Sequence, residues 1–265
     1  MRAGVTLVLA ALTVTVCACG SEETKPAAPP KVSSFQLPSK LMGRPLDQVL
    51  VTPAGGGEGR ALLVFLHGYG ATGIGTLSPA FVQALRRLGD DAPVVLLPEG
   101  DVGWWYDRRD GPWGSYVLRE AIPAALARSG ADPDRVAVGG ISMGGFGALD
   151  LGRNRGLFCA VGGHSPAVYE RGTSDALFGF DDRADFTGHD LLTIASKRSP
   201  YDAPVWIDVG DYDRLRPAAS KLAKELRRLR PTSAFTSGPG VTRAATGTRT
   251  SGSTSSSTPT LVTSR

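Results

Sequence analysis

Residues 135–149, RVAVGGISMGGFGAL, constrain the fold of this chain more than any other stretch. The apolar run 136–138 predicts a buried strand, and the small residues from Gly145 onward predict a helix. Between them, residues 140–144 match G-x-S-x-G, in which a serine stands on a sharp turn from strand to helix. The helix N-terminus then places N–H groups and positive potential beneath the Ser142 hydroxyl. The pattern predicts that Ser142 is a nucleophile; the alternative is a glycine-rich turn with an incidental serine.

A second glycine-rich loop follows the apolar run 61–66, which predicts a parallel strand covered on both faces. In acyl-transfer enzymes such a loop offers one backbone N–H to the oxyanion, and the residue after the nucleophile offers the other. These two roles fall on Tyr69 and Met143. His67 opens the loop and is a candidate base, but we expect it to orient the loop instead.

Apolar runs alternate with helical patterns along the chain. The sequence predicts strands over 48–52, 61–66, 93–97, 136–138, 158–162 and 204–209, and helices over 78–88, 115–128 and 221–230. This alternation predicts an α/β fold, with a mostly parallel sheet and helices on both faces. Residues 170–203 are polar and irregular, which suits an insertion or lid, and we expect His189 within them to be solvated.

Two loops follow predicted strands at the carboxyl edge of the sheet, where open parallel sheets bind ligands. The loop 103–106 contains Trp104 and Trp105, which either line an acyl or aryl pocket or form a packed loop. The loop 163–166 brings His164 to the same edge. Trp104, Trp105 and His164 are therefore candidate substrate-pocket residues.

A serine hydrolase of this architecture takes its partners in the chain order serine, acid, histidine. Asp213 is the preferred acid, because the G-x-x-D pattern after strand 204–209 puts its carboxylate beyond a tight turn. Asp211 is the alternative. Asp208 is less favoured, because it would alternate into the sheet.

The remaining composition is that of an ordinary globular domain, which we place at 41–230. The chain has 265 residues, 42% of them hydrophobic and 20% charged. Its net charge of +4 is spread along the sequence and gives no case for nucleic-acid binding. Of three cysteines only Cys159 belongs to the domain, so no disulfide can form within it, and we expect its side chain to be buried.

The first 40 residues predict export and a tether. Residues 1–20 combine Arg2 with an apolar run that is too short to span a bilayer. Residues 16–19, VCAC, resemble a bacterial lipobox, which implies cleavage before Cys19 and lipidation of its thiol; ordinary signal-peptidase cleavage is the alternative. Residues 21–40 contain four prolines and predict a tether to the membrane surface.

The end of the chain has a different character. Residues 231–265 hold 18 Ser or Thr among 35 and no Asp, Glu or His. This composition predicts a disordered tail, so that the last strand of the sheet is missing.

Taken together, the chain resembles the putative-esterase family of the α/β-hydrolase fold, which includes feruloyl esterases and mycolyltransferases. The matching stretches are 63–70, 103–106, 138–149, 163–166 and 208–213. The resemblance implies hydrolysis of a small-molecule ester without a metal or organic cofactor, with the nucleophile on Ser142 and the acid on Asp213. It also implies a last strand and a histidine after the acid.

That histidine is missing here, because His67, His164 and His189 all precede Asp213. His164 lies on the correct edge to replace it, although we do not expect it to. We predict a frameshift near residues 230–235: with suitable codons, the DNA for residues 235–247 read two bases later encodes HVWPGGHEGSYW. The alternative is a genuine Ser/Thr-rich extension, such as a wall-spanning stalk.

The function predicted from the sequence is therefore serine esterase, through an acyl-enzyme on Ser142, with activity reduced by the missing histidine. One alternative is a non-catalytic cell-surface binding protein built on a hydrolase scaffold. The other is an acyltransferase that passes the acyl group to an alcohol.

Overall fold

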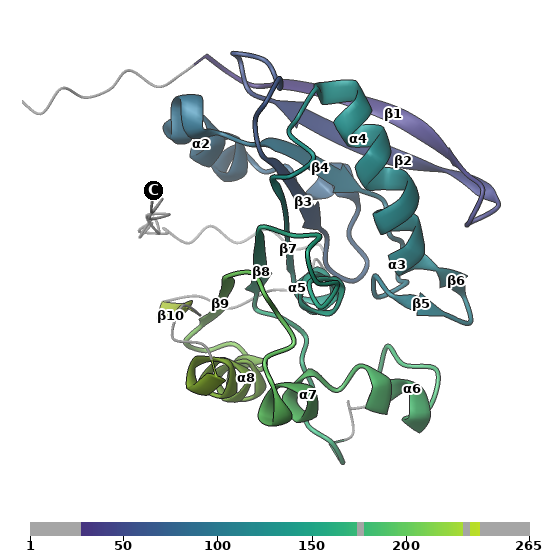
Figure 1. Ribbon diagram of the computed structural model, residues 1–265, viewed down its shortest axis with the longest axis vertical. Coiled ribbons are helices and arrows are strands. Elements are labelled where there is room, and N and C mark those ends of the chain that lie inside the picture. Colours follow the sequence, from purple (N-terminus) through teal and green to yellow (C-terminus); the bar gives the residue numbers. More distant parts are fainter. Residues whose placement is uncertain (1–27, 174–177, 230–233, 239–265) are drawn as a thin grey trace, which may run out of the picture.

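The computed structural model describes residues 28–173, 178–229 and 234–238 (Figure 1). Its centre is an eight-stranded sheet with the strand order β1-β2-β4-β3-β7-β8-β9-β10. The first two strands pair antiparallel, and β4, β3, β7, β8, β9 and β10 run parallel to one another. The predicted mostly parallel sheet is confirmed. The predicted export signal and the lipidation site Cys19 lie outside the described residues.

The strands are β1 (Lys31–Ser39), β2 (Arg44–Thr52), β3 (Leu62–Leu66), β4 (Val94–Pro98), β5 (Asp107–Arg108), β6 (Gly111–Pro112), β7 (Val136–Ile141), β8 (Ala160–His164), β9 (Val205–Gly210) and β10 (Ala234–Gly238). The helices are α1 (Gly73–Thr76), α2 (Pro79–Leu88), α3 (Trp113–Tyr116), α4 (Ile122–Ser129), α5 (Met143–Leu151), α6 (Arg183–Gly188), α7 (Leu191–Lys197) and α8 (Arg216–Leu229), with a 3₁₀ turn η1 (Gly89–Asp91) and a π-helical turn η2 (Val117–Ala121). In the part of the chain with described coordinates, no helix is both long and apolar enough to cross a bilayer.

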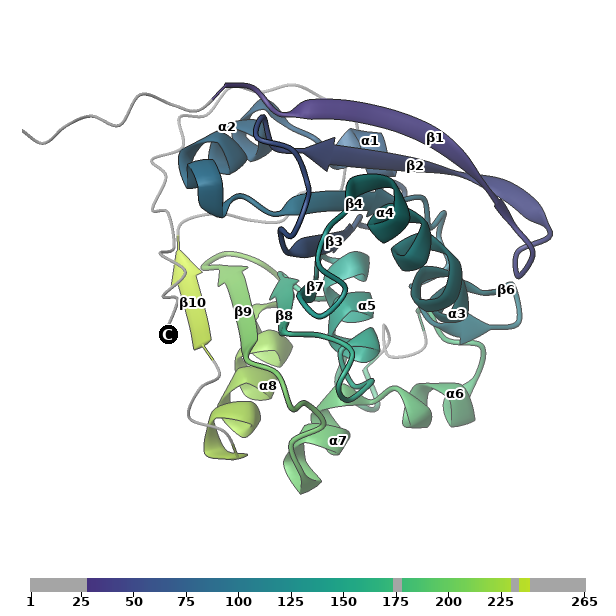
Figure 2. The same cartoon turned by 45° about the horizontal axis from the view of Figure 1, so that its top comes forward.

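Helices cover both faces of the sheet, as the sequence predicts (Figure 2). Side chains of a strand alternate between faces, so Val64 and Phe65 of β3 enter different clusters. Val64 belongs to the larger core, which is shared with α4, α5 and α8. Phe65 packs on the smaller cluster beneath α2. Helix α5 is buried along its whole length, which fixes the position of the serine that precedes it.

The predicted helix over 115–128 forms, but it contains a π-helical turn between α3 and α4. Pro123 follows this turn. A proline has no N–H, and in a regular α-helix its ring would clash with the carbonyl oxygen one turn earlier. The wider π-helical turn avoids that clash. The π-helical turn also carries Glu120, whose carboxylate accepts hydrogen bonds from the backbone N–H groups of Lys40 and Leu41. The helix is thereby joined to the turn between β1 and β2.

The tether predicted for residues 21–40 is wrong from Lys31 onward, because Lys31–Ser39 form strand β1. Phe35 and Leu37 alternate with exposed residues, and this period of two directs one face of the strand inward. Pro38 is tolerated because β1 is an edge strand. The globular domain therefore begins at least ten residues earlier than the predicted boundary at 41.

Three further predictions need correction. Residues 170–203 are not simply irregular, because they contain α6 and α7, with Phe186 and Leu191 in the core. The last strand is not missing, because Ala234–Gly238 pair in parallel with β9 as strand β10. Hydrogen bonding to the neighbouring strand outweighs the polar composition of this segment. Cys159 is exposed rather than buried, because it lies one residue before β8.

Candidate active site

The serine stands on a strained turn between β7 and α5. Strand β7 ends at Ile141 and helix α5 begins at Met143. Ser142 between them has φ 57° and ψ −115°, a conformation that L-residues rarely adopt. Such strain persists only where the surroundings enforce it, and it concentrates at functional sites. The predicted strand–turn–helix arrangement around Ser142 is confirmed.

The two glycines of the G-x-S-x-G motif are required by close packing of the backbone. A Cβ on Gly144 would lie 2.0 Å from the carbonyl oxygen of Leu66, and one on Gly140 would lie 2.3 Å from the carbonyl oxygen of Gly144. Neither distance leaves room for a side chain, and in both cases the obstacle is backbone. The motif therefore matches the structure in its spacing and also in the physical reason for each glycine.

The predicted oxyanion loop lies directly against the serine. A Cβ on Gly68 would lie 3.5 Å from the Cβ of Ser142, so residues 67–70 pass beside the turn. Met143 is the first residue of α5, so its N–H has no partner within the helix. Among the described residues, no backbone acceptor is found for the N–H of Met143 or of Tyr69. The structure thus places the loop that contains Tyr69 beside Ser142, and the oxyanion roles of the two N–H groups stay a prediction.

His67 fixes the loop from below, as predicted. It is fully buried, and its Nε2 accepts a hydrogen bond from the Gly100 N–H at 3.0 Å, while its Nδ1 lies 2.9 Å from the Gly68 carbonyl oxygen. Glu99 lies beside it, with Oε1 3.2 Å from Nε2. Burial alone raises the pKa of Glu99, but the adjacent His67 ring and hydrogen bonds from the N–H groups of Asp101 and Gly100 outweigh it, so this pKa lies below its usual value.

Trp104 and Trp105 form a packed loop. The two residues are 2% and 0% exposed. The indole N–H of Trp105 donates to the carbonyl oxygen of His67 at 3.1 Å. The ring of Trp104 packs edge-on against Phe146 and Phe178, with centroids 5.6 Å apart in each pair. Of the two predicted roles, this burial favours support of the oxyanion loop over lining of an open pocket.

The preferred acid, Asp213, lies in the tight turn after β9. Its N–H donates to the carbonyl oxygen of Gly210 at 3.1 Å, which confirms the turn expected from G-x-x-D. Its buried carboxylate accepts a hydrogen bond from the Leu215 N–H at 2.9 Å, just before α8 begins. Asp211 is more exposed, and its N–H donates to the carbonyl oxygen of Gly238 in β10. Both carboxylates are at the carboxyl edge of the sheet.

The structure shows a pair that the sequence analysis missed. Nδ1 of His164, at the end of β8, lies 2.9 and 2.8 Å from the two carboxylate oxygens of Asp208 on β9. The two residues are opposite each other in the parallel register, so their side chains share one face. Asp208 was disfavoured as an acid because it would alternate into the sheet, but the face onto which it alternates also carries His164. The sequences G-G-H and I-D-V-G at the ends of these two strands contain both residues, but only the strand register shows that His164 and Asp208 lie opposite each other.

His189 is not solvated, contrary to prediction. Its Nδ1 lies 3.0 Å from a carboxylate oxygen of Asp150, and its ring centroid is 4.2 Å from that of Tyr106. It therefore belongs to the packing around α5 and α6. In the described structure, none of the three histidines is hydrogen-bonded to the Ser142 hydroxyl.

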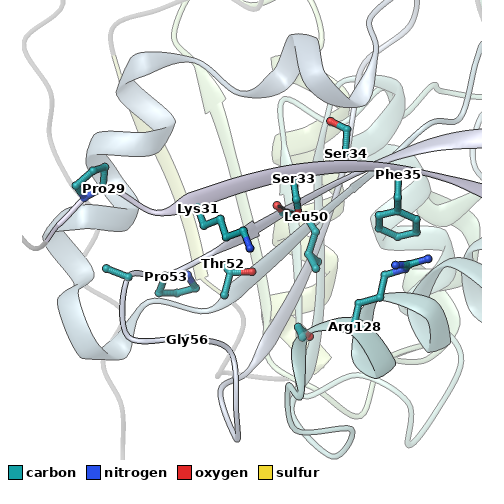
Figure 3. A pocket seen from close by; sticks show the side chains of 12 residues that line it. Pro29, Lys31, Ser33, Ser34, Phe35, Leu50, Thr52, Pro53, Gly56 and Arg128 are labelled. Atoms are coloured by element: carbon teal, nitrogen blue, oxygen red, sulfur yellow. Dashed lines mark hydrogen bonds between the residues drawn. The ribbon is translucent and has the colours of Figure 1, made fainter.

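A hollow of about 820 Å³ lies far from the serine, between β1, the end of β2 and the end of α4 (Figure 3). Thr52 on its wall is at the amino edge of the sheet, since Val51 pairs with Val95 at the start of β4. Arg128 also lines the hollow, and its guanidinium carbon lies 4.0 Å from the ring centroid of Phe35. None of the predicted catalytic or pocket residues lines this hollow. Within residues 28–173, 178–229 and 234–238, no cluster of three or more His, Cys, Asp or Glu is arranged to hold a metal ion.

Comparison with known families identifies the chain. The model of the esterase family, described as "Putative esterase", matches residues 39–240. The chain belongs to this family. Membership makes it a carboxylic-ester hydrolase of the α/β-hydrolase fold, and the matched region contains both glycine-rich loops and strand β10. A comparison with curated proteins found no match.

Solved esterase structures share the fold. A ferulic acid esterase superposes with a TM-score of 0.69 at 18% identity, covering 81% of this chain and 92% of the other. The S-formylglutathione hydrolase from Agrobacterium tumefaciens gives 0.63 at 20% identity, covering 83% and 90%. FphF, a fluorophosphonate-binding serine hydrolase of Staphylococcus aureus, gives 0.62 at 16% identity, covering 82% and 93%. At such identities these likenesses show the common fold.

Proposed function

We propose that this esterase acts through a covalent acyl-enzyme on Ser142. The observation that carries the proposal is the strained backbone of Ser142, held in place by glycines that leave no room for a side chain. Strain of this kind exposes a hydroxyl above the sheet, and it has no structural use that an unstrained turn would not serve better. The substrate is a small-molecule carboxylic ester, and no cofactor is required.

The reaction proceeds in two halves. Ser142 Oγ attacks the ester carbonyl carbon, and the N–H groups of Tyr69 and Met143 stabilise the negative oxygen of the tetrahedral intermediate. The alcohol leaves with a proton, and the acyl group remains on Ser142. Water then attacks the acyl-enzyme, releases the carboxylic acid and restores the serine hydroxyl. Asp213 is the proposed acid partner of the histidine in an intact site.

The histidine expected after Asp213 is absent, and we attribute this to a frameshift near residues 230–235. The position of β10 supports this explanation. Residues 234–238 pair beside β9, and the alternative reading HVWPGGHEGSYW begins at residue 235, so its strand would occupy this place and its Gly-Gly-His would follow at the carboxyl edge. A nucleotide read of codons 225–265 tests it: an overlapping frame that encodes this ending supports the frameshift, and its absence from both alternative frames refutes it.

A second candidate function is a non-catalytic binding protein at the cell surface. The missing histidine favours it, whereas the intact nucleophile turn and oxyanion loop disfavour it. Acyl transfer to an alcohol is a variant of the enzymatic proposal, and product analysis with an added alcohol separates transfer from hydrolysis. The lipobox-like residues 16–19 further support an exported protein, lipidated on Cys19 and held at the membrane by its lipid anchor or secreted. Mass spectrometry of membrane and secreted fractions tests this placement.

The enzymatic proposal is tested by hydrolysis of p-nitrophenyl acetate. Ser142→Ala should lower the rate to that of the uncatalysed reaction plus the small contribution of the oxyanion hole. Ser196→Ala is the matched control, because Ser196 is an exposed serine of α7 whose hydroxyl donates to the Thr193 carbonyl oxygen of its own helix. Equal rates for the parent and Ser142→Ala would refute the proposal and favour a binding protein.

A further inference from the structure

We propose that His164 and Asp208 serve as the general base and its orienting acid for Ser142 in this chain. The inference rests on the proposed esterase function and answers the question of which group deprotonates the serine. Its basis is the pair itself: Nδ1 of His164 lies 2.8 Å from one carboxylate oxygen of Asp208 and 2.9 Å from the other.

The carboxylate decides which nitrogen of the ring carries the proton. An ionised carboxylate only accepts hydrogen bonds, so Nδ1 of His164 donates, and the neutral ring keeps its lone pair on Nε2. Among the described residues, Nε2 has no hydrogen-bond partner. A histidine held by a carboxylate at Nδ1 with an unoccupied Nε2 is the form that accepts a serine proton.

Backbone contacts place this pair beside the nucleophile. The Ser142 N–H donates to the carbonyl oxygen of His164 at 2.9 Å, and Ile141 pairs with His164 in the parallel register of β7 and β8. Asp208 lies on β9, on the other side of β8. Acid, base and nucleophile therefore come from three adjacent strands in that spatial order, as the neighbouring ends of β9, β8 and β7 show in Figure 2.

The ring of His164 has room to move. Its side chain is 41% exposed, and the aromatic ring nearest to it is that of Phe65, with centroids 5.7 Å apart. Nε2 is not bonded to the Ser142 hydroxyl in the described structure, so the Ser142 side chain and the His164–Asp208 pair must move toward each other when an ester binds, with Nδ1 still held by Asp208. Catalytic hydrogen bonds are often long in unliganded enzymes and tighten in the complex with substrate.

The other two histidines are committed elsewhere. His67 is fully buried, with both ring nitrogens bonded within the oxyanion loop and its support. His189 packs on Tyr106 and lies against Asp150 at 3.0 Å. His164 is the histidine that combines a carboxylate partner, exposure and direct backbone contact with Ser142.

In this proposal Nε2 of His164 carries the proton in both halves of the reaction. As Ser142 Oγ bonds to the ester carbon, its proton moves to Nε2 of His164, and the imidazolium is stabilised by Asp208. The bond from carbon to the alcohol oxygen breaks, and Nε2 returns the proton to that oxygen. In the second half, water gives a proton to Nε2 and its oxygen to the acyl carbon, and Ser142 Oγ leaves with the proton from Nε2.

The test compares variants of the full chain in hydrolysis of p-nitrophenyl acetate. His164→Ala should lower kcat/KM by about 100-fold or more, and Asp208→Asn by roughly 10-fold or more, because the ring loses its base or its orientation. Added imidazole should restore part of the His164→Ala rate by entering the vacated space. The double variant Ser142→Ala/His164→Ala measures hydrolysis by imidazole itself, and His189→Gln, with its melting temperature followed, is the matched histidine control.

Restoration by imidazole supports the proposal, since a merely structural role would not respond to it. A His164→Ala variant with parental kcat/KM overturns it, and so does a loss that imidazole does not restore. A parent that reacts with a fluorophosphonate at Ser142 but turns over no faster than Ser142→Ala also overturns it, while leaving Ser142 as the nucleophile. A parent that neither reacts nor turns over refutes the proposed function as well.

Discussion

The two halves of the catalytic edge differ in how completely they are built. The half formed by β3 and β7 holds the strained Ser142, the close-packed Gly144 and the loop anchored by His67 and Glu99. The half formed by β8, β9 and β10 holds carboxylates in place but has no histidine after Asp213. Each part of the first half is recognisable from a short local motif, and the pairing of β3 with β7 brings the two motifs together. The second depends on a distant segment, so a change confined to the end of the chain damages it alone.

The largest effect is expected from Gly144→Ala, which attacks the complete half. The new Cβ would lie 2.0 Å from the Leu66 carbonyl oxygen, so the turn must shift, at a cost of about 4 kcal/mol or more in the free energy of unfolding. Chemical denaturation measures this cost. Gly188→Ala is the control, because no atom lies within 4 Å of a Cβ there. Equal stability of the two variants would mean that the elbow is not tightly packed.

Next in size is repair of the incomplete half. Replacing residues 235–265 by a segment that begins HVWPGGHEGSYW should raise kcat/KM for p-nitrophenyl acetate by roughly 10-fold or more above the rate that His164 supports, because a fully positioned general base contributes about 10²–10⁴-fold. The same segment with Gly-Gly-Ala in place of Gly-Gly-His is the matched control. If both segments raise the rate equally, the gain comes from covering the sheet and the histidine hypothesis fails.

Asp213→Asn separates two roles of one carboxylate. In the parent chain it should cost about 1 kcal/mol of stability through the weakened hydrogen bond from Leu215, with little change in rate. In the repaired protein it should also lower kcat, because the new histidine loses its acid partner. Unfolding curves and rates of both backgrounds check this. A rate that is unchanged in the repaired protein would move the acid role to Asp211.

The last prediction concerns the anchor of the oxyanion loop. Glu99 has a folded-state pKa below its ordinary value of 4.5, so its charge stabilises the fold above that pH and the contribution is lost as pH falls through the lowered value. Glu99→Gln should therefore lower stability by about 1–2 kcal/mol at pH 7 and by much less in acid. Melting temperatures of the parent and of Glu99→Gln, taken from pH 7 to pH 3, measure this difference in stability. A difference that grows as the pH falls would contradict the lowered pKa of Glu99.

Local patterns in the sequence were sufficient to predict the complete half. The spacing of Gly140, Ser142 and Gly144 describes one turn and can be read locally, although the backbone that excludes a side chain at Gly144 is that of Leu66 in the neighbouring strand β3. The structural role of His67 and the turn before Asp213 were predicted for the same reason. Strands and helices were located well where apolar runs were continuous, as in β4 and β9.

Features that depend on pairing between distant strands were not predicted. His164 and Asp208 are 44 residues apart, and only the register of β8 with β9 brings them together. Strand β1 was hidden by Pro38 and by its polar residues, although edge strands tolerate both. The burial of Trp104 depends on Phe178 and Phe180, which lie in a segment that was predicted to be irregular. Such contacts follow from topology, which a single sequence specifies weakly.

The central claim is that Ser142 is an activated nucleophile in an otherwise incomplete site. The most direct measurement is to treat the parent chain, its Ser142→Ala variant and the repaired protein with a fluorophosphonate and to locate the added mass by peptide mass spectrometry. We expect labelling of Ser142 in the parent, faster labelling of the same residue in the repaired protein and no labelling in Ser142→Ala. Labelling at another residue, or none in either protein that retains Ser142, would contradict it.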